Sequence, residues 1–390
     1  MKILIILNAV LCALASDLHS SGWARQNIRS NNHISSSSSS SESEEQASNI
    51  LKTRVYNPEQ CHLVPVPTTE EINRFRQWTQ KHNKHYPSEH EKLCRMINVV
   101  KKLRDIQAHN ERFKAGKETF TRALNYLSDL TRQEMEANIL IDDWNINSHY
   151  ISYLENLPEP RESVDYRKEN LVGPVGTQDN CGSSWTWSVA AVLESQLRKC
   201  RISEEAVSVQ NILDCVEQYP KVCRGGSIFK ALFHGTTGGI LPARKYPYQE
   251  TSNGCTYNET DIIGYVKEAF EYHSHRFTGF ELIMRKLVSF VGPISTVLYA
   301  DEKFENYKSG VFTSNDCSST KRNHAVTIIG YGTDPKFGDY WLLKNSWGPT
   351  WGDKGFGKIA RGSNLCQFES SVYFAEVTDN KRNVCSLEKH

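Results

Sequence analysis

Hydrophobic and polar positions divide this chain of 390 residues into three regions. Residues 3–15 form an apolar run, residues 17–69 are mostly polar, and apolar residues recur with helical or strand periodicity from residue 70 onward. The polar region contains an unbroken run of serines at 35–41 and cannot bury enough apolar surface to fold, so we expect a disordered extension over 17–69. A linker is the simplest interpretation, and phosphorylation or contact with mineral is the alternative.

The first periodic segments predict two helices. Ile72, Phe75 and Trp78 fall on one helical face. A second helix is predicted from about Glu89 to Lys114, because six positions in it are spaced by 4, 4, 3, 4 and 4 residues and form one stripe. The stripe consists of Glu91, Arg95, Val99, Lys102, Ile106 and Asn110. By itself this pattern indicates an amphipathic helix.

A loop is predicted to become a helix within residues 178–188. Gly173, Pro174 and Gly176 favour tight turns before it, and an apolar helical pattern follows over residues 189–197. Ser184 therefore lies near a helix N-terminus, where the helix dipole and the unpaired N–H groups of the first turn favour a nucleophile. An ordinary serine N-cap is the alternative interpretation.

Two apolar stretches of the C-terminal region predict buried strands with polar residues at their ends. His324 precedes a β-branched run that ends in glycine, and Asn345 and Trp347 follow the apolar stretch 340–343. Taken singly, His324 is more typical of a structural residue and Asn345 of a turn. The pair of Asn and Trp after a strand, followed by a glycine-rich segment, is more specific.

Composition limits the compartment and the partners. A net charge of +1 offers no electrostatic case for binding nucleic acid or an anionic membrane, while eleven cysteines favour an oxidising compartment. The apolar run 3–15 is too short to span a bilayer and ends in an A-x-A pattern, which predicts a signal peptide over 1–16; an uncleaved anchor is the alternative. We therefore expect a secretory-pathway protein without a membrane anchor after cleavage, and a surface glycan at the sequon of Asn258.

The stripe and two further motifs resemble the cathepsin L-like members of the papain family. Four stripe positions match the interrupted E-R-F-N-I-N motif of their prosegment, whereas Val99 and Lys102 depart from it. Residues 123–129 resemble the next prosegment motif, and residues 163–167 resemble the opening of the mature domain, with Tyr166 in place of Trp. The resemblance implies an α+β, two-lobed papain-like fold behind a small helical prosegment whose tail lies in the active-site cleft. The implied divisions are an inhibitory prosegment at 70–135, a linker and processing region at 136–159, a peptidase domain at 160–376 and a tail at 377–390.

The same resemblance implies the site residues. Ser184 stands where the family has its nucleophilic cysteine, and Gln178 matches the side chain that helps form the oxyanion hole. His324 matches the base, Asn345 the residue that orients it, and Trp347 the shield of their hydrogen bond. The implied substrate-binding residues are the strand-edge glycines and the walls of the main specificity pocket, which favour an apolar side chain. They are Gly225, Gly226, Ser227, Val297 and Ala325.

The resemblance also implies three disulfides, Cys181–Cys223, Cys215–Cys255 and Cys317–Cys366. Sequence alone does not give this connectivity. Cys200 and Cys385 remain in the mature region, and we hypothesise that they pair. No cysteine or histidine cluster indicates a metal site, and we expect no cofactor. We expect a monomer whose partners are its own prosegment and a peptide or protein bound in the cleft.

Serine at the nucleophile position leaves three functions open. A papain-like site ionises a thiol, and its helix terminus cannot ionise a hydroxyl in the same way. We therefore favour a peptide-binding homologue of the peptidases with little or no proteolytic activity. The alternatives are an active hydrolase that uses Ser184, and a silicatein-like condensing protein. Silicateins carry a serine cluster close before the histidine, where this chain has only Ser318 and Ser319 followed by Thr320.

Overall fold

The computed structural model describes residues 66–136, 157–216, 222–314, 316–317, 321–379 and 383–384. Contacts divide the chain after Ile50, and every described residue belongs to the second unit, Leu51–His390. The predicted signal peptide, nearly all of the polar extension, most of the linker and the serines before His324 lie outside the described residues. None of the helices described is long and apolar enough to cross a membrane.

The prosegment consists of three helices and one strand. They are α3 (Thr69–Lys81), α4 (Glu89–Lys114), β1 (Phe120–Arg122) and α5 (Arg132–Glu136). The predicted bounds of α4 are confirmed, because Ser88 caps its first turn by accepting a hydrogen bond from the backbone of Glu91. Helix α3 begins one residue before the expected boundary, since Thr68 and Glu71 form a reciprocal capping box.

The next part of the chain is mainly helical. Its helices are α7 (Ser184–Lys199), α8 (Val209–Val216) and α9 (Ile228–His234). Helix α7 lies at the centre of this lobe, since its residues Trp185, Val189 and Leu197 are fully buried among side chains of α8 and α9. Tyr373 and Val377, from a strand of the second lobe, complete this core.

The second lobe is built on an antiparallel sheet. Its strands are β2 (Val164–Asp165), β3 (Tyr265–His273), β4 (Ile294–Leu298), β6 (His324–Asp334), β7 (Gly338–Lys344), β8 (Phe356–Ala360), β9 (Ser371–Asp379) and β10 (Asn383–Val384). The order is β10-β9-β4-β6-β7-β8, with β2 paired to β6 and β3 paired to β9. Helix α10 (Phe280–Phe290) and the short α11 (Glu302–Glu305) complete the lobe. The α+β, two-lobed class expected from the sequence is confirmed.

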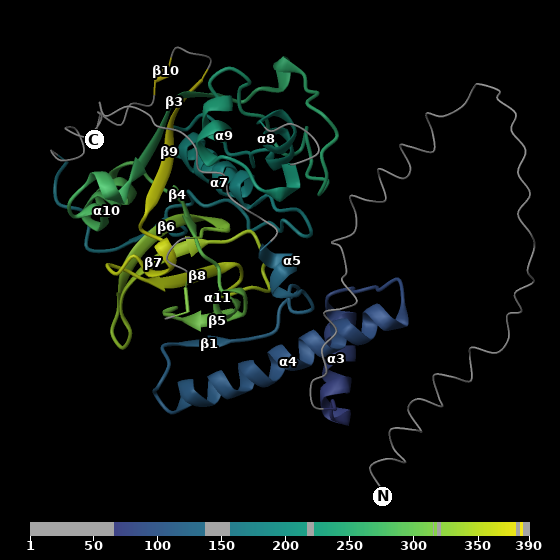
Figure 1. The fold of residues 1–390 in the computed structure, drawn as a ribbon. Helices are drawn as coiled ribbons and strands as arrows, with labels where there is room; N and C mark the ends of the chain where they lie inside the picture. Colours follow the sequence, from purple (N-terminus) through teal and green to yellow (C-terminus); the bar gives the residue numbers. More distant parts are fainter. Residues whose placement is uncertain are drawn as a thin grey trace, which may run out of the picture. The chain divides into compact units, whose positions relative to one another are not determined.

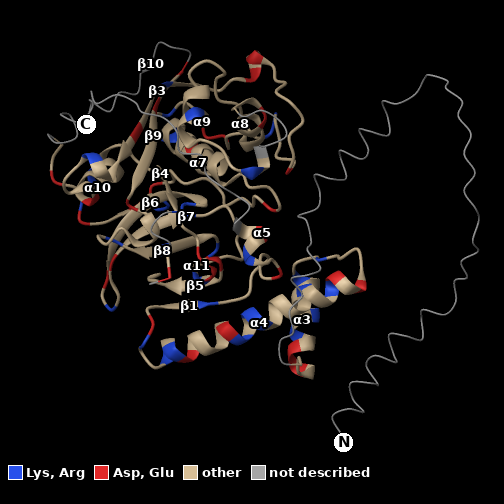
Figure 2. Cartoon of the chain, in the orientation of Figure 1, with Lys and Arg blue, Asp and Glu red and all other residues tan. Residues whose placement is uncertain are grey.

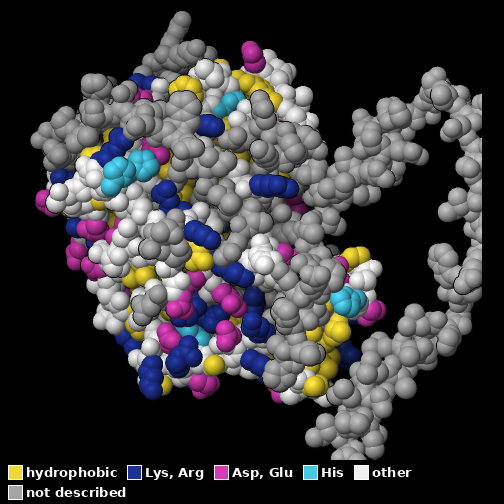
Figure 3. All heavy atoms as spheres, viewed as in Figure 1, with side chains coloured by type: hydrophobic (Ala, Val, Ile, Leu, Met, Phe, Trp, Pro, Cys, Tyr) yellow, Lys and Arg dark blue, Asp and Glu magenta, His cyan; other side chains and the backbone are white. Residues whose placement is uncertain are grey.

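The prosegment is packed into the sheet lobe through both side chains and backbone. Its residues Phe120, Leu127, Leu130 and Met135 belong to the same buried cluster as the core of that lobe. Strand β1 pairs antiparallel with β5 (Tyr307–Gly310), and α4 follows the outside of this pair (Figure 1). Charges of both signs alternate along α4 (Figure 2) and are interspersed over the described part of the face in Figure 3.

Candidate active site

Ser184 is the first residue of α7 and not its N-cap. The capping position belongs to Ser183, whose hydroxyl contacts the hydroxyl of Tyr248 at 2.8 Å and makes no capping bond. Ser184 is 3% exposed, and its Oγ accepts a hydrogen bond of 3.2 Å from the backbone N–H of Ala325. The N-cap interpretation is therefore wrong, while the location at the positive end of the helix dipole stands.

His324 and Asn345 form a buried pair beneath Trp347. The ring Nε2 lies 2.7 Å from Oδ1 of Asn345, which also accepts the backbone N–H of Ser346. Because that oxygen can only accept, Nε2 carries the hydrogen and Nδ1 keeps its lone pair. The indole of Trp347 stacks on the imidazole at 4.1 Å between ring centroids. Burial lowers the pKa of His324 to about 4, so the ring is neutral at pH 7.

Ser184 and His324 come from the two lobes and meet at β6. Ala325, the donor to Ser184, directly follows His324 at the start of that strand. Both side chains lie in the described part of the chain, and no hydrogen bond joins the hydroxyl to the imidazole. The oxygen of Ser184 is therefore held by the β6 backbone and is not activated by the histidine in this arrangement.

Hydrogen bonds of both its side chain and its backbone hold Gln178 in place. Its Nε2 donates to the carbonyl of Cys181 at 3.0 Å, and its Oε1 accepts from the hydroxyl of Ser346 at 2.7 Å. Its backbone N–H donates to Ser346 O, and its carbonyl accepts from the hydroxyl of Tyr248. Ser346 and Tyr248 were not singled out from the sequence: Tyr248 lies outside the motifs, and Ser346, between Asn345 and Trp347, had no role assigned to it.

The residues expected to bind substrate lie on both sides of Ser184. Gly225 and Gly226 immediately precede α9, and a Cβ on Gly226 would come within 2.5 Å of the indole of Trp185. Ser227 is the N-cap of α9, so its hydroxyl is occupied by the backbone N–H of Lys230. Val297 on β4 and Ala325 on β6 are opposite each other in the sheet and belong to a buried apolar cluster. Their role as pocket walls stays a prediction.

The prosegment covers the site from the sheet-lobe side. Leu127 and Met135 line a small cavity together with Gln178, His324 and Trp347. Helix α5, which carries Met135, is therefore adjacent to the candidate base. The continuation of the prosegment after Glu136, expected in the cleft, lies outside the described residues.

The stripe of α4 anchors the segment that leads to α5. Arg95 is buried and its Nη1 contacts Glu134 of α5 at 2.7 Å, while its Nη2 contacts Glu91 at 3.2 Å. Lys102, one of the two departures from the family motif, is also buried and donates from Nζ to the carbonyl of Leu130 at 2.8 Å. Arg95 and Lys102 of the stripe thus bind the segment from Leu130 to Glu134, and this contact explains why both side chains are buried.

The three implied disulfides are confirmed. Bonds join Cys181 to Cys223, Cys215 to Cys255 and Cys317 to Cys366. The first of these fixes the loop before Ser184, where Gly182 N–H also donates to the carbonyl of Cys223.

Two further expectations concern the surface and the tail. Cys200 is disulfide-bonded, but its predicted partner Cys385 lies outside the described residues. Asn258 is exposed and its side chain caps a short helix by accepting from the backbone of Thr260. Within the described ranges, no group of three or more His, Cys, Asp or Glu is arranged to hold a metal ion.

Comparison with known proteins identifies both parts of the chain. Residues 160–376 match the family described as papain family cysteine protease, and residues 75–135 match the cathepsin propeptide inhibitor domain. The chain is 35% identical to cathepsin K of Mus musculus over 310 residues, which cover 77% of this chain and 92% of that protein. It is 33% identical to pro-cathepsin H of Bos taurus over 306 residues, which cover 77% and 88%.

Solved structures of proenzymes share the fold. Digestive procathepsin L 3 from the larval midgut of Tenebrio molitor superposes with a TM-score of 0.71 at 28% identity, covering 79% of this chain and 99% of that one. The recombinant stem bromelain precursor gives 0.69 at 28% identity, covering 78% and 98%. The chain therefore belongs to the papain family of cysteine proteases, with a cathepsin-type propeptide ahead of the peptidase region.

Proposed function

We propose that this protein binds peptides through a papain-type cleft and has little or no proteolytic activity. The observation that carries the proposal is the serine at the start of α7, whose oxygen is bonded to the backbone of Ala325 and not to His324. Ser184 stands at the position that resembles the family's nucleophilic cysteine, between Gln178 and the His324–Asn345 pair. The substitution thus falls on the reacting atom and leaves the surroundings in place.

The energetics of a hydroxyl oppose efficient cleavage. A helix terminus contributes up to ~2 kcal/mol, which is about one and a half pKa units and far too little to ionise serine. Attack would require His324 Nδ1 to remove the proton during the step and to become an imidazolium. Asn345 offers that imidazolium a neutral amide where serine proteases provide a carboxylate, and burial of the ring already disfavours its charged form. We expect a loss of several orders of magnitude, at about 1.4 kcal/mol per tenfold.

A hydrolase that uses Ser184 is the second candidate. The neutral state of His324 supports it, since Nδ1 carries a lone pair that could act as a general base. The silicatein-like alternative depends on Ser318 and Ser319, which lie outside the described residues, and it stays a hypothesis.

The experiment compares four proteins after removal of the prosegment: the wild type, Ser184→Cys, His324→Ala, and Ser183→Cys as a matched control that introduces a thiol one residue away. Fluorogenic peptides report cleavage, and peptide binding is measured alongside. Turnover that appears only in Ser184→Cys, with binding in the wild type, is the expected result. Comparable turnover by the wild type that is lost in His324→Ala would establish the hydrolase instead. Condensation of silicic acid by the wild type would identify the third function.

We also propose that the protein acts as a monomer in the secretory pathway, either outside the cell or in the lysosomal or endosomal lumen. The three disulfides whose two cysteines both lie in the described residues, and the cathepsin relatives, support an oxidising, secretory setting. A glycan at the exposed Asn258 would agree with this route, and a mass shift on treatment with a glycosidase would test it. The prosegment is proposed to act as the protein's own inhibitor.

A further inference from the structure

One arginine of the prosegment is held by three groups of the peptidase region. Arg132, the first residue of α5, donates from Nη1 to the carboxylate of Glu305 at 2.8 Å and to the carbonyl of Ala300 at 2.9 Å. Its guanidinium also lies over the ring of Tyr299, 5.0 Å from the centroid. A carboxylate, a carbonyl and an aromatic face are the groups that recognise a guanidinium in proteins.

This arginine site lies beside the candidate catalytic residues. Glu305 ends α11 and is 2% exposed. Together with Ala300 it lines the same cavity as His324 and Trp347. The group that binds Arg132 is therefore part of the wall next to the histidine, and it belongs to the peptidase region and not to the prosegment.

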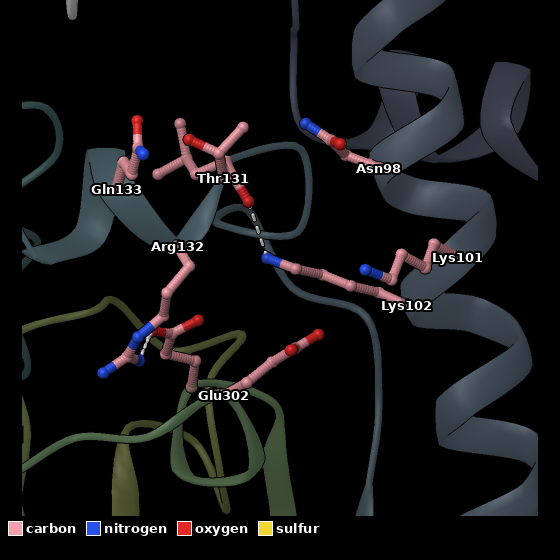
Figure 4. Close-up of a pocket in the computed structure, with 9 residues that line it drawn as sticks. Asn98, Lys101, Lys102, Thr131, Arg132, Gln133 and Glu302 are labelled. Atoms are coloured by element: carbon pink, nitrogen blue, oxygen red, sulfur yellow. Dashed lines mark hydrogen bonds and ion pairs between the residues drawn. The ribbon is translucent and has the colours of Figure 1, made fainter. Parts of the chain in front are cut away.

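The carboxylate of Glu305 depends on prosegment cations. Burial raises its pKa to about 7, and the charges of Lys102 and Arg132 act against that rise. Figure 4 shows Arg132 extending from α5 and Lys102 extending from α4 into a cavity of about 300 Å³ between the prosegment and α11. Both cations belong to the prosegment, so its removal leaves the Glu305 carboxylate without them.

We propose that Tyr299, Ala300 and Glu305 form a subsite for an arginine side chain of the peptide bound in the cleft, which Arg132 fills in the proprotein. The inference rests on the proposed function, in that a peptide enters this cleft once the prosegment has left. In the family reaction the histidine returns its proton to the leaving amine, so the wall beside His324 and Trp347 faces the part of the peptide that follows the reacting bond. The arginine therefore belongs to that part of the ligand.

Arginine fits this subsite better than lysine. One nitrogen of Arg132 bonds to two acceptors while the planar guanidinium lies over the ring of Tyr299; a lysine ammonium can also reach two acceptors, but it has no planar face to stack on the ring. The apolar pocket expected from Ser227, Val297 and Ala325 is a different part of the cleft from this arginine subsite. None of these three residues is acidic, and Glu305 belongs to no sequence motif that would predict its place at the cleft.

The test uses the protein after removal of its prosegment and three fluorescent peptides that differ at one position. The position carries arginine, citrulline, which has the same shape without the charge, or lysine. We expect arginine to bind about tenfold or more tightly than citrulline, with lysine between them. In Glu305→Gln the arginine and citrulline peptides should bind alike, whereas the neighbouring Glu302→Gln should keep the preference. Tyr299→Leu should reduce the preference without abolishing it.

The outcomes separate this inference from the proposed function. Equal binding of the arginine and citrulline peptides by the wild type, or a preference that persists in Glu305→Gln, would overturn the subsite alone. Absence of binding for every peptide would overturn the peptide-binding function and the subsite with it. Cleavage mapping with Ser184→Cys supplies the position: the preference is expected after the cleaved bond, and a preference confined to the preceding residues would refute the placement.

Discussion

Helix α5 of the prosegment lies next to the site, and a buried arginine of α4 holds it there. Arg95 contacts Glu134 of α5 at 2.7 Å, and the two side chains are 7% and 9% exposed. Helix α5 also carries Met135, which lines the cavity beside His324. Replacement of Arg95 by methionine keeps an unbranched side chain but removes the guanidinium and its charge, so it should loosen α5 and uncover Ser184.

The expected magnitude follows from burial. Removing one partner of a buried ion pair costs about 3–5 kcal/mol, because the other charge stays buried without its partner. Glu134 would keep its bonds from the backbone and hydroxyl of Thr131, which places the cost at the lower end. A cost of about 3 kcal/mol corresponds to a change of more than a hundredfold in the equilibrium between docked and undocked α5.

The assay requires no catalysis. In a Ser184→Cys background, alkylation of the new thiol by iodoacetamide measures how often the site is uncovered, and peptide mapping locates the label. Arg74→Met is the matched control, since Arg74 pairs with Glu70 on the surface of α3 and the two side chains are 44% and 74% exposed. An exposed pair contributes at most about 1 kcal/mol. The Arg95 variant should therefore label far faster than the control, and equal rates in the two would refute the proposed anchoring of α5.

Three further predictions concern the site and its lobes. Asn345→Asp places a carboxylate beside Nε2 of His324, so it should raise the pKa of His324 above about 4 and increase turnover by Ser184. NMR titration and peptide cleavage test this, and an unchanged pKa of His324 would contradict it. Because burial lowers the pKa of His324 from 6.5 to about 4, the unfolded chain binds more protons between these values, so stability should fall by up to ~3 kcal/mol as the pH drops from 6.5 to 4. The melting temperature should depend less on pH across that range in His324→Gln, and the same dependence in the variant and the wild type would show that His324 is not the group responsible. Gly226→Ala brings a methyl group within 2.5 Å of the Trp185 ring and should cost about 1–3 kcal/mol, whereas a wild-type melting temperature would show that the ring yields freely.

Local patterns were sufficient where the determinants are close in sequence. The bounds of α4 could be predicted because the cap at Ser88 and the turn at Gly116 lie next to the periodic stripe. The disulfides followed from a resemblance that spans most of the chain, and the structure confirms all three. At α7 the predicted location of Ser184 at the start of a helix is confirmed, but the capping role stayed open in the sequence, since Ser183 and Ser184 are equally good capping residues by type and only the fold assigns the positions.

Long-range contacts explain what the sequence did not predict. Arg132 and Glu305 are separated by 173 residues, and neither belongs to a periodic or motif-based pattern. Lys102 was recognised as a departure from the family motif, but its role depends on a distant segment, which places the carbonyl of Leu130 within reach of its Nζ. A charged residue becomes buried only when tertiary structure supplies its partners, and those partners are not visible from either segment alone.

The pairing of β1 with β5 has a consequence for the order of events during synthesis. Phe120 is opposite Gly310, so the two strands are separated by 190 residues of chain. At the usual pace of the ribosome, roughly 10–40 s pass between the emergence of the first strand and the second. The prosegment has therefore been synthesised before β5 emerges. A Cβ on Gly310 would come within 2.3 Å of the carbonyl of Thr119, so only glycine fits beside β1 at this position. The pairing of β1 with β5 can therefore form only after the peptidase region has been synthesised as far as Gly310, which ties this contact of the prosegment to a late stage of synthesis.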